Sequence, residues 1–142
     1  MVSRWARVGY SVVSFAVGIG FFGVIAALYA GSSSPENRVS TMFWFCFPAC
    51  IFAVPGWVLA LPIVLTQTHI DGWRFWAFLG LGTALGPAAI AAFEVYGWIA
   101  NGRTGRFDDF GLGFFFLGAI VAGVTSLVYL LLLRRAQSRI AA

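Results

Sequence analysis

Hydrophobic residues in this chain fall into four long blocks that are separated by short polar segments. Three blocks, at residues 8–30, 42–65 and 110–133, contain no Asp, Glu, Lys, Arg or His. The fourth, at residues 75–100, carries one acid, Glu94. About 20 consecutive apolar residues suffice for a helix to cross the hydrocarbon core of a bilayer. The pattern predicts an all-α integral membrane protein, a four-transmembrane-helix bundle whose helices occupy about these four ranges.

The composition supports a membrane protein without a soluble domain. The 142 residues are 61% hydrophobic and 10% charged, whereas soluble domains are about 45–50% apolar and about 25% charged. The connecting segments are short, so residues 1–142 are expected to form a single transmembrane domain. The net charge of +4 is spread over loops and a tail, RRAQSR at 134–139. This placement favours anionic lipid as a partner and gives no indication of nucleic-acid binding.

Three prolines mark the second hydrophobic block. Pro48, Pro55 and Pro62 are seven residues apart, which is nearly two helical turns, so their rings lie on one face of a helix. A proline in a spanning helix removes one backbone hydrogen bond and bends the helix. We expect a curved second helix. The alternative is a re-entrant segment that turns back at Pro55 and Gly56.

The arginines predict the orientation, because cytoplasmic loops of membrane proteins carry an excess of positive charge. All nine basic residues are arginines. With a cytoplasmic N-terminus, six lie inside and three outside, namely Arg4, Arg7, Arg74, Arg134, Arg135 and Arg139 against Arg38, Arg103 and Arg106. This distribution predicts both termini in the cytoplasm of a bacterial cell (inner) membrane. A signal peptide that ends near residues 28–31 is the alternative for the first block.

Glycine-rich stretches indicate close helix packing. GIGFFG at 18–23 matches G-x-G-x-x-G, but a dinucleotide site needs a preceding strand and an accessible loop. A run within a membrane helix has neither. Gly82 and Gly86 form a small-xxx-small pair that allows two helix backbones to approach each other.

Glu94 is the main candidate for a functional site, since an ionisable residue within a span is costly. Helical spacing places Thr83 on the same face as Glu94, together with other small residues of the third block, Gly80, Pro87, Ala91 and Gly97. Glu94 and Thr83 are therefore candidates for a proton, cation or substrate site. The alternative is a structural pairing of Glu94 with Arg103.

The sulfur atoms of the second block are a second candidate for a functional site, in this case one that binds a metal. Met42, Cys46 and Cys50 recur every four residues along one side of the second helix. Thiolate and thioether ligands select Cu(I), and the hypothesis is a copper-binding stripe. Buried thiols also pack simply as small apolar groups.

The residues needed for catalysis are sparse. His69 is the only histidine and falls in a loop, and no serine or cysteine nucleophile is predicted beside it. We therefore expect a non-enzymatic accessory or structural subunit without a cofactor, which forms a homo- or hetero-oligomer with other membrane helices. The alternative is a small homo-oligomeric transporter or channel that uses Glu94.

Overall fold

Four α-helices make up the protein in the computed structural model, which describes residues 2–29, 35–67, 70–101 and 109–141. They are α1 (Arg4–Tyr29), α2 (Pro35–Thr66), α3 (Gly72–Asn101) and α4 (Asp109–Ala141). The described residues contain no strand, so the predicted all-α class is confirmed. α2 starts earlier and α4 ends later than predicted, because a helix need not stop where its apolar residues end.

Three of the helices are long and apolar enough to cross a membrane. The candidate spans within the described residues are Arg4–Leu28, Gly72–Gly97 and Phe115–Ile140. In α2 the apolar stretch that qualifies is shorter, Ala53–Thr66. The chain is therefore an all-helical protein with three candidate membrane spans, and α2 is a long helix that contains a fourth, shorter apolar segment.

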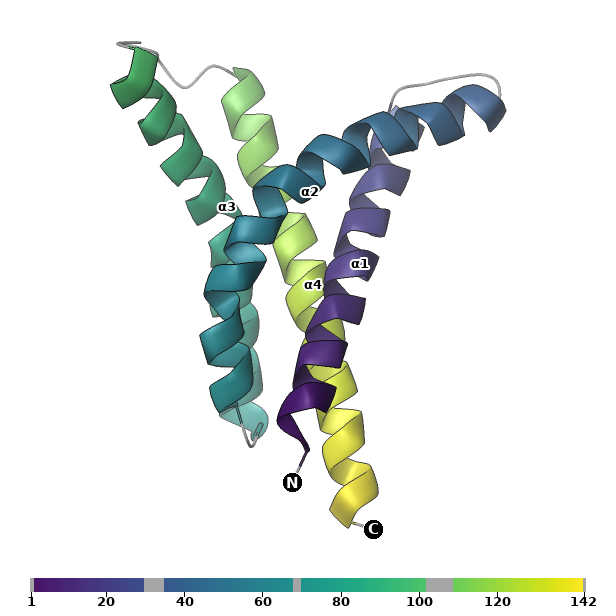
Figure 1. Cartoon of the computed structure of the whole chain (residues 1–142), viewed down its shortest axis with the longest axis vertical. Helices are drawn as coiled ribbons and strands as arrows, with labels where there is room; N and C mark the ends of the chain where they lie inside the picture. The colour runs from purple at the N-terminus through teal and green to yellow at the C-terminus, as the bar shows by residue number, and fades with distance from the viewer. Residues whose placement is uncertain (1, 30–34, 68–69, 102–108, 142) are drawn as a thin grey trace.

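The helices form a V (Figure 1). α1 packs on both α2 and α4, α3 packs on α4, and α2 and α3 touch each other only slightly. Both termini and the α2–α3 connection lie at the narrow end of the V, which we call the closed end. At the opposite end, the open end, the α1–α2 pair diverges from the α3–α4 pair.

α2 is bent, as its prolines predict. It remains one continuous helix through Pro48, Pro55 and Pro62, and Figure 1 shows that it slopes across the molecule before it runs down to the closed end. The helix does not reverse at Pro55 and Gly56, so the re-entrant alternative is wrong. Its two ends lie at opposite ends of the V.

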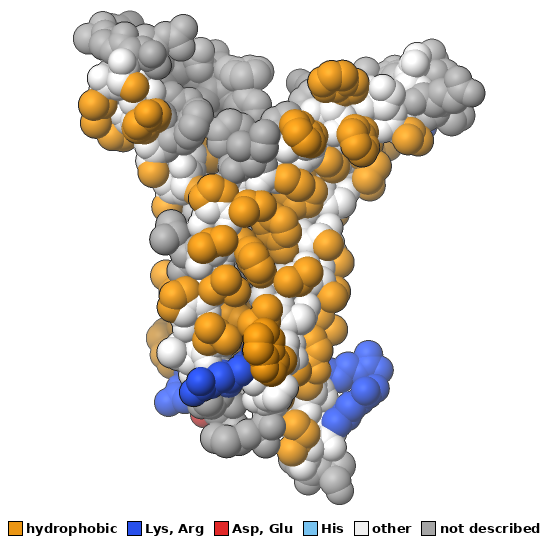
Figure 2. Space-filling view, in the orientation of Figure 1, with side chains coloured by type: hydrophobic (Ala, Val, Ile, Leu, Met, Phe, Trp, Pro, Cys, Tyr) orange, Lys and Arg blue, Asp and Glu red, His pale blue; other side chains and the backbone are white. Residues whose placement is uncertain are grey.

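Most fully buried apolar side chains lie near the closed end. Leu130 and Leu133 of α4 are almost inaccessible, and they belong to one buried cluster with Ile70, Phe75 and Tyr129. This cluster joins the start of α3 to the last turns of α4. Elsewhere, a large share of the apolar side chains is exposed, as expected for helices that face hydrocarbon (Figure 2).

Glycines mediate the closest helix contacts. A Cβ atom on Gly86 would run into the backbone of Gly118, and a Cβ atom on Gly82 would run into Ser126. The predicted small-xxx-small pair therefore provides the α3–α4 contact. Gly18, from GIGFFG, packs in the same way against Thr125 of α4.

Candidate functional site

Thr83 and Glu94, the predicted ion or substrate residues, both belong to α3. The half-buried Thr83 hydroxyl donates to the Leu79 carbonyl oxygen at 2.8 Å, and the side chain lies beside Gly123 of α4. The side chain of Glu94 lies outside the described residues, as do His69 and Arg103. The role of Glu94, and its pairing with Arg103, stay predictions.

The predicted sulfur stripe faces α1. Met42 and Cys46 pack against Gly23, and the Cys46 thiol donates to the Ile19 carbonyl oxygen at 3.5 Å. Cys46 and Cys50 are both free and half-buried. Within the described part of the chain, no three His, Cys, Asp or Glu side chains group together as metal ligands would. The contacts of Met42 and Cys46 are those of helix packing, and copper binding stays a prediction.

The main hollow of the molecule is an apolar groove between α2 and α3, with a volume of about 470 Å³. α1 and α4 form its floor, because α2 and α3 scarcely meet. Small residues dominate its lining, which includes Ala49, Ala53, Gly56, Ala89, Gly118 and Ala122. The volume is within the range of roughly 300–1,000 Å³ that is usual for small-molecule sites.

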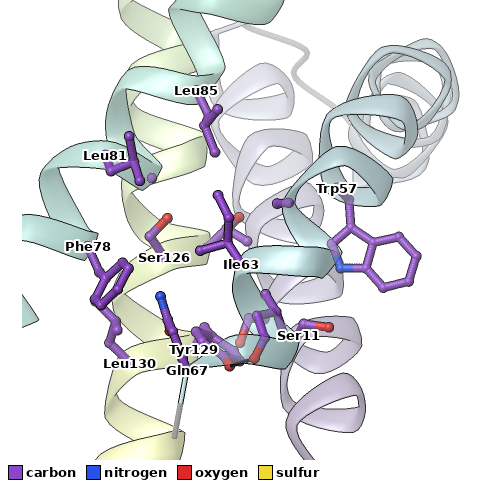
Figure 3. Close-up of a pocket in the computed structure, with 15 residues that line it drawn as sticks. Ser11, Trp57, Ile63, Gln67, Phe78, Leu81, Leu85, Ser126, Tyr129 and Leu130 are labelled. Atoms are coloured by element: carbon purple, nitrogen blue, oxygen red, sulfur yellow. Dashed lines mark hydrogen bonds between the residues drawn. The ribbon is translucent and has the colours of Figure 1, made fainter. Parts of the chain in front are cut away.

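A smaller pocket of about 110 Å³ continues this groove toward the closed end (Figure 3). The two hollows share six lining residues, Trp57, Ala60, Gly82, Leu85, Thr125 and Ser126. The groove and the pocket therefore form one continuous site that contacts all four helices. We call the smaller part the polar pocket after four of its lining residues, Ser11, Ser14, Gln67 and Tyr129, but its accessible surface is almost entirely apolar.

Most hydroxyl groups of the polar pocket are bonded within their own helix. The hydroxyls of Ser11, Ser14 and Thr125 donate to the carbonyl oxygens of Val8, Tyr10 and Val121 at 2.6–2.9 Å. Such bonds are the usual solution for a hydroxyl in a membrane helix. Ser11 and Ser14 are themselves buried, so their hydroxyls contribute little accessible surface to the pocket.

Three buried polar atoms at the site have no hydrogen-bond partner among the described residues. They are the Gln67 carbonyl oxygen Oε1, the Trp57 indole nitrogen Nε1 and the Arg7 guanidinium Nε. Gln67 is only 8% exposed, and Figure 3 shows its amide pointing inward from the closed end toward Ser126. A buried polar group without a partner costs about 1–3 kcal/mol, so each of these atoms lowers the stability of the fold.

Arg7 fixes the closed end from beneath the polar pocket. Its guanidinium Nη1 donates to the carbonyl oxygens of Leu65 and Gln67 at 2.6 and 2.7 Å. These carbonyls lie at the C-terminus of α2, where a helix leaves carbonyls without internal partners. The side chain is only 5% exposed, and Tyr129 adds a weaker hydrogen bond to the Val64 carbonyl oxygen at 3.4 Å. Arg7 thereby ties α1 to the end of α2.

The residues of this site were not predicted as functional. The sequence pattern uses Arg7 only for the orientation of the chain, and it does not single out Trp57 or Gln67. A usable signal was the position of Gln67, a neutral polar residue directly after an apolar block. Comparisons with protein family models, with curated proteins and with solved structures found no match for this chain.

Proposed function

We propose that the protein is a non-enzymatic accessory subunit of a bacterial inner membrane. It crosses the bilayer four times with both termini in the cytoplasm, and it packs through α3 against a helix of another membrane protein or of a second copy. A membrane helix does not associate through hydrophobicity alone, because lipid is as apolar as leucine. The proposal therefore depends on an exposed surface of α3 that allows the backbone of another helix to approach closely.

The observation that carries the proposal is an exposed ridge of small residues on α3. Gly80, Ala84, Ala88 and Ala92 follow one another at four-residue spacing, and all four are exposed. Gly80 has no neighbouring atom within 4 Å of an added Cβ. By helical geometry this ridge points away from Gly86, the residue that contacts α4. Small residues at this spacing are typical of helix pairs in membranes.

The arginines support the proposed orientation. Among the described residues, six arginines belong to the segments that meet at the closed end, and Arg38 belongs to the open end. The six are Arg4, Arg7, Arg74, Arg134, Arg135 and Arg139. Exposed tryptophans flank the apolar surface, with Trp5 and Trp73 near the closed end and Trp44 in the first part of α2. The arginines favour a closed end that faces the cytoplasm, and the tryptophans favour a membrane interface near each end of the molecule.

A leucine on the ridge tests the proposal. Ala88→Leu places a large side chain where a partner helix would approach, so the amount of complex is expected to fall about tenfold. Ala16→Leu is the matched control, because Ala16 is an exposed alanine on the lipid-facing side of α1. The measurement is native mass spectrometry of protein released gently from its own membranes.

Wild type and Ala16→Leu are expected to carry a second polypeptide or a second copy, which Ala88→Leu loses. The proposal is wrong if wild type is a single 15.4 kDa chain. It is equally wrong if Ala88→Leu retains the complex.

A further inference from the structure

We propose that the exposed arginines of the closed end bind the phosphate groups of anionic phospholipids in the leaflet that surrounds this end. We call these residues the arginine belt, and they are Arg4, Arg74, Arg134, Arg135 and Arg139. Figure 2 shows arginine side chains on both flanks of the closed end. The inference rests on the part of the proposed function that places the chain in a membrane, and it does not rest on the packing role of α3.

The contact between α1 and α4 brings Arg4 and Arg139 to one level. Gly18 of α1 packs against Thr125 of α4, and the two helices run in opposite directions, since both termini lie at the closed end. Arg4 precedes Gly18 by 14 residues. Arg139 follows Thr125 by 14 residues. At the helical rise, each arginine therefore lies about 21 Å from this contact. We call this pair the outer tier of the belt.

The contact between α3 and α4 brings Arg74 to the level of Arg134. Gly82 of α3 packs against Ser126 of α4, and these helices also run in opposite directions. Arg74 precedes Gly82 by eight residues. Arg134 follows Ser126 by eight residues, and Arg135 is its neighbour. Arg74 and Arg134 thus lie about 12 Å from the contact. We call these three arginines the inner tier.

The two tiers match the depth of lipid headgroups. Gly18 and Thr125 lie close to the midpoints of the candidate spans Arg4–Leu28 and Phe115–Ile140. The hydrocarbon core ends about 15 Å from the midplane of a bilayer, and the headgroup region ends at about 20–22 Å. The inner tier is therefore at the edge of the hydrocarbon, where long side chains extend outward to the phosphates. The outer tier lies among the headgroups.

Two tryptophans mark the same interface. Trp5 is 85% exposed and is adjacent to Arg4, and Trp73 is 81% exposed and is adjacent to Arg74. Exposed indole rings prefer the level of the headgroups. A soluble acidic protein would meet this end only beyond the headgroups. The anion that is available at the depth of the belt is a lipid phosphate.

The charge of the belt selects an anionic lipid over a zwitterionic one. Asp71 is the only acidic residue whose side chain the structure describes, so five exposed guanidinium groups are set against one described carboxylate. A guanidinium group binds phosphate oxygens through two parallel hydrogen bonds, and a cluster of arginines at the interface attracts lipids with a net negative charge. Arg7 is not part of the belt, because it is buried and its Nη1 atom donates to two backbone carbonyls.

Lipid titration of the full-length protein in a neutral detergent tests this inference. Dioleoyl phosphatidylglycerol and dioleoyl phosphatidylcholine carry the same acyl chains and differ in net charge. Native mass spectrometry measures the binding of each lipid, and phosphatidylglycerol is expected to bind at least fivefold more tightly. Thermal unfolding follows the same titrations in 0.1 M and 1 M salt. The larger stabilisation by phosphatidylglycerol should largely disappear in 1 M salt, where the Debye length is about 3 Å.

A pair of substitutions on α4 locates the lipid. Arg135→Gln combined with Arg139→Gln removes two charges of the belt, and the affinity for phosphatidylglycerol is expected to fall about fivefold for each. Arg135→Lys combined with Arg139→Lys keeps both charges and should retain most of the affinity. Arg38→Gln is the matched control, because Arg38 is exposed on α2 at the open end, and it should change the affinity less than twofold. Without lipid, all variants should unfold at the temperature of wild type, since the substituted residues are exposed.

Several results would overturn the inference. One is equal binding of the two lipids, and another is an unchanged affinity for phosphatidylglycerol in the double glutamine variant. Tighter binding of soluble polyglutamate than of phosphatidylglycerol would also overturn it, because the arginines would then suit an acidic protein. These titrations use the chain without a partner, so their failure is separate from a failure of the α3 packing role.

Discussion

The closed and open ends of the molecule are held together by different interactions. At the closed end, Arg7 and Tyr129 bond to backbone carbonyls of α2, and Leu130 and Leu133 are fully packed. At the open end, α2 and α3 diverge, and Phe43, Trp44, Phe47, Tyr96, Ile99 and Phe116 are exposed. Sequence composition alone does not reveal this difference, since both ends are built from the same apolar helices.

The comparison indicates that polar interactions specify this fold where hydrophobic ones cannot. In a bilayer, burying one more leucine adds little, because lipid solvates it as well as protein does. Hydrogen bonds from a buried guanidinium, and close contacts at glycine, then determine which helices meet. Substitutions at the two ends, and at the glycines between them, should therefore lower the free energy of unfolding by different amounts.

The largest loss of stability is expected on substitution of Arg7. Arg7→Leu removes both hydrogen bonds to the C-terminal carbonyls of α2, and we expect a loss of about 3 kcal/mol in the free energy of unfolding. Thermal unfolding in detergent micelles measures the change. Arg4→Leu is the control, because Arg4 is exposed and should shift stability by less than about 0.5 kcal/mol. Equal stabilities of the two variants would show that Arg7 does not fix the closed end.

The second largest loss of stability is expected in the middle of the α3–α4 contact. Gly86→Ala places a methyl group against the backbone of Gly118, which cannot move aside easily, so a loss of about 2 kcal/mol is expected. Gly80→Ala on the same helix meets open space and should be neutral or stabilising by up to about 1 kcal/mol. The same unfolding assay applies. A harmless Gly86→Ala would contradict the close approach of these helices.

The smallest loss of stability is expected on substitution of Gly23, where α1 meets α2 toward the open end. The atoms nearest to an added methyl group there belong to the side chains of Met42 and Cys46. Methionine is flexible and can repack, so Gly23→Ala should cost less than about 1 kcal/mol. A cost as large as that of Gly86→Ala would show that the open end is packed as rigidly as the α3–α4 contact.

The sequence predicts the helices well because the bilayer imposes their length. Blocks of apolar residues locate all four helices, and three spaced prolines predict the bend of α2. The order of packing, with α1 and α4 in the centre, has no comparable signal, because helices that are apolar on every side do not show which face is buried. The start of α2 at Pro35 was also missed, since its first residues are polar.

The candidate site was predictable only in part. The close contact at Gly82 and Gly86 follows from their spacing, but its partners on α4 do not. Arg7 bonds to a residue that lies 60 positions away, and nothing local to Arg7 indicates this partner. Gln67 and Trp57 are of interest because their polar atoms are buried without partners, which is a property of the fold and not of the residue types.

Cysteine labelling of intact cells tests the central claim, that α2 crosses the membrane and the closed end faces the cytoplasm. Ser40→Cys on α2 and Ser138→Cys on α4 are each introduced into a Cys46→Ala, Cys50→Ala background, and a membrane-impermeant maleimide is added. Both serines are exposed. We predict labelling of position 40 in intact cells, and of position 138 only after the cells are permeabilised. Labelling of both positions in intact cells would contradict the account, because a chain with three spans and a cytoplasmic N-terminus places its C-terminus outside.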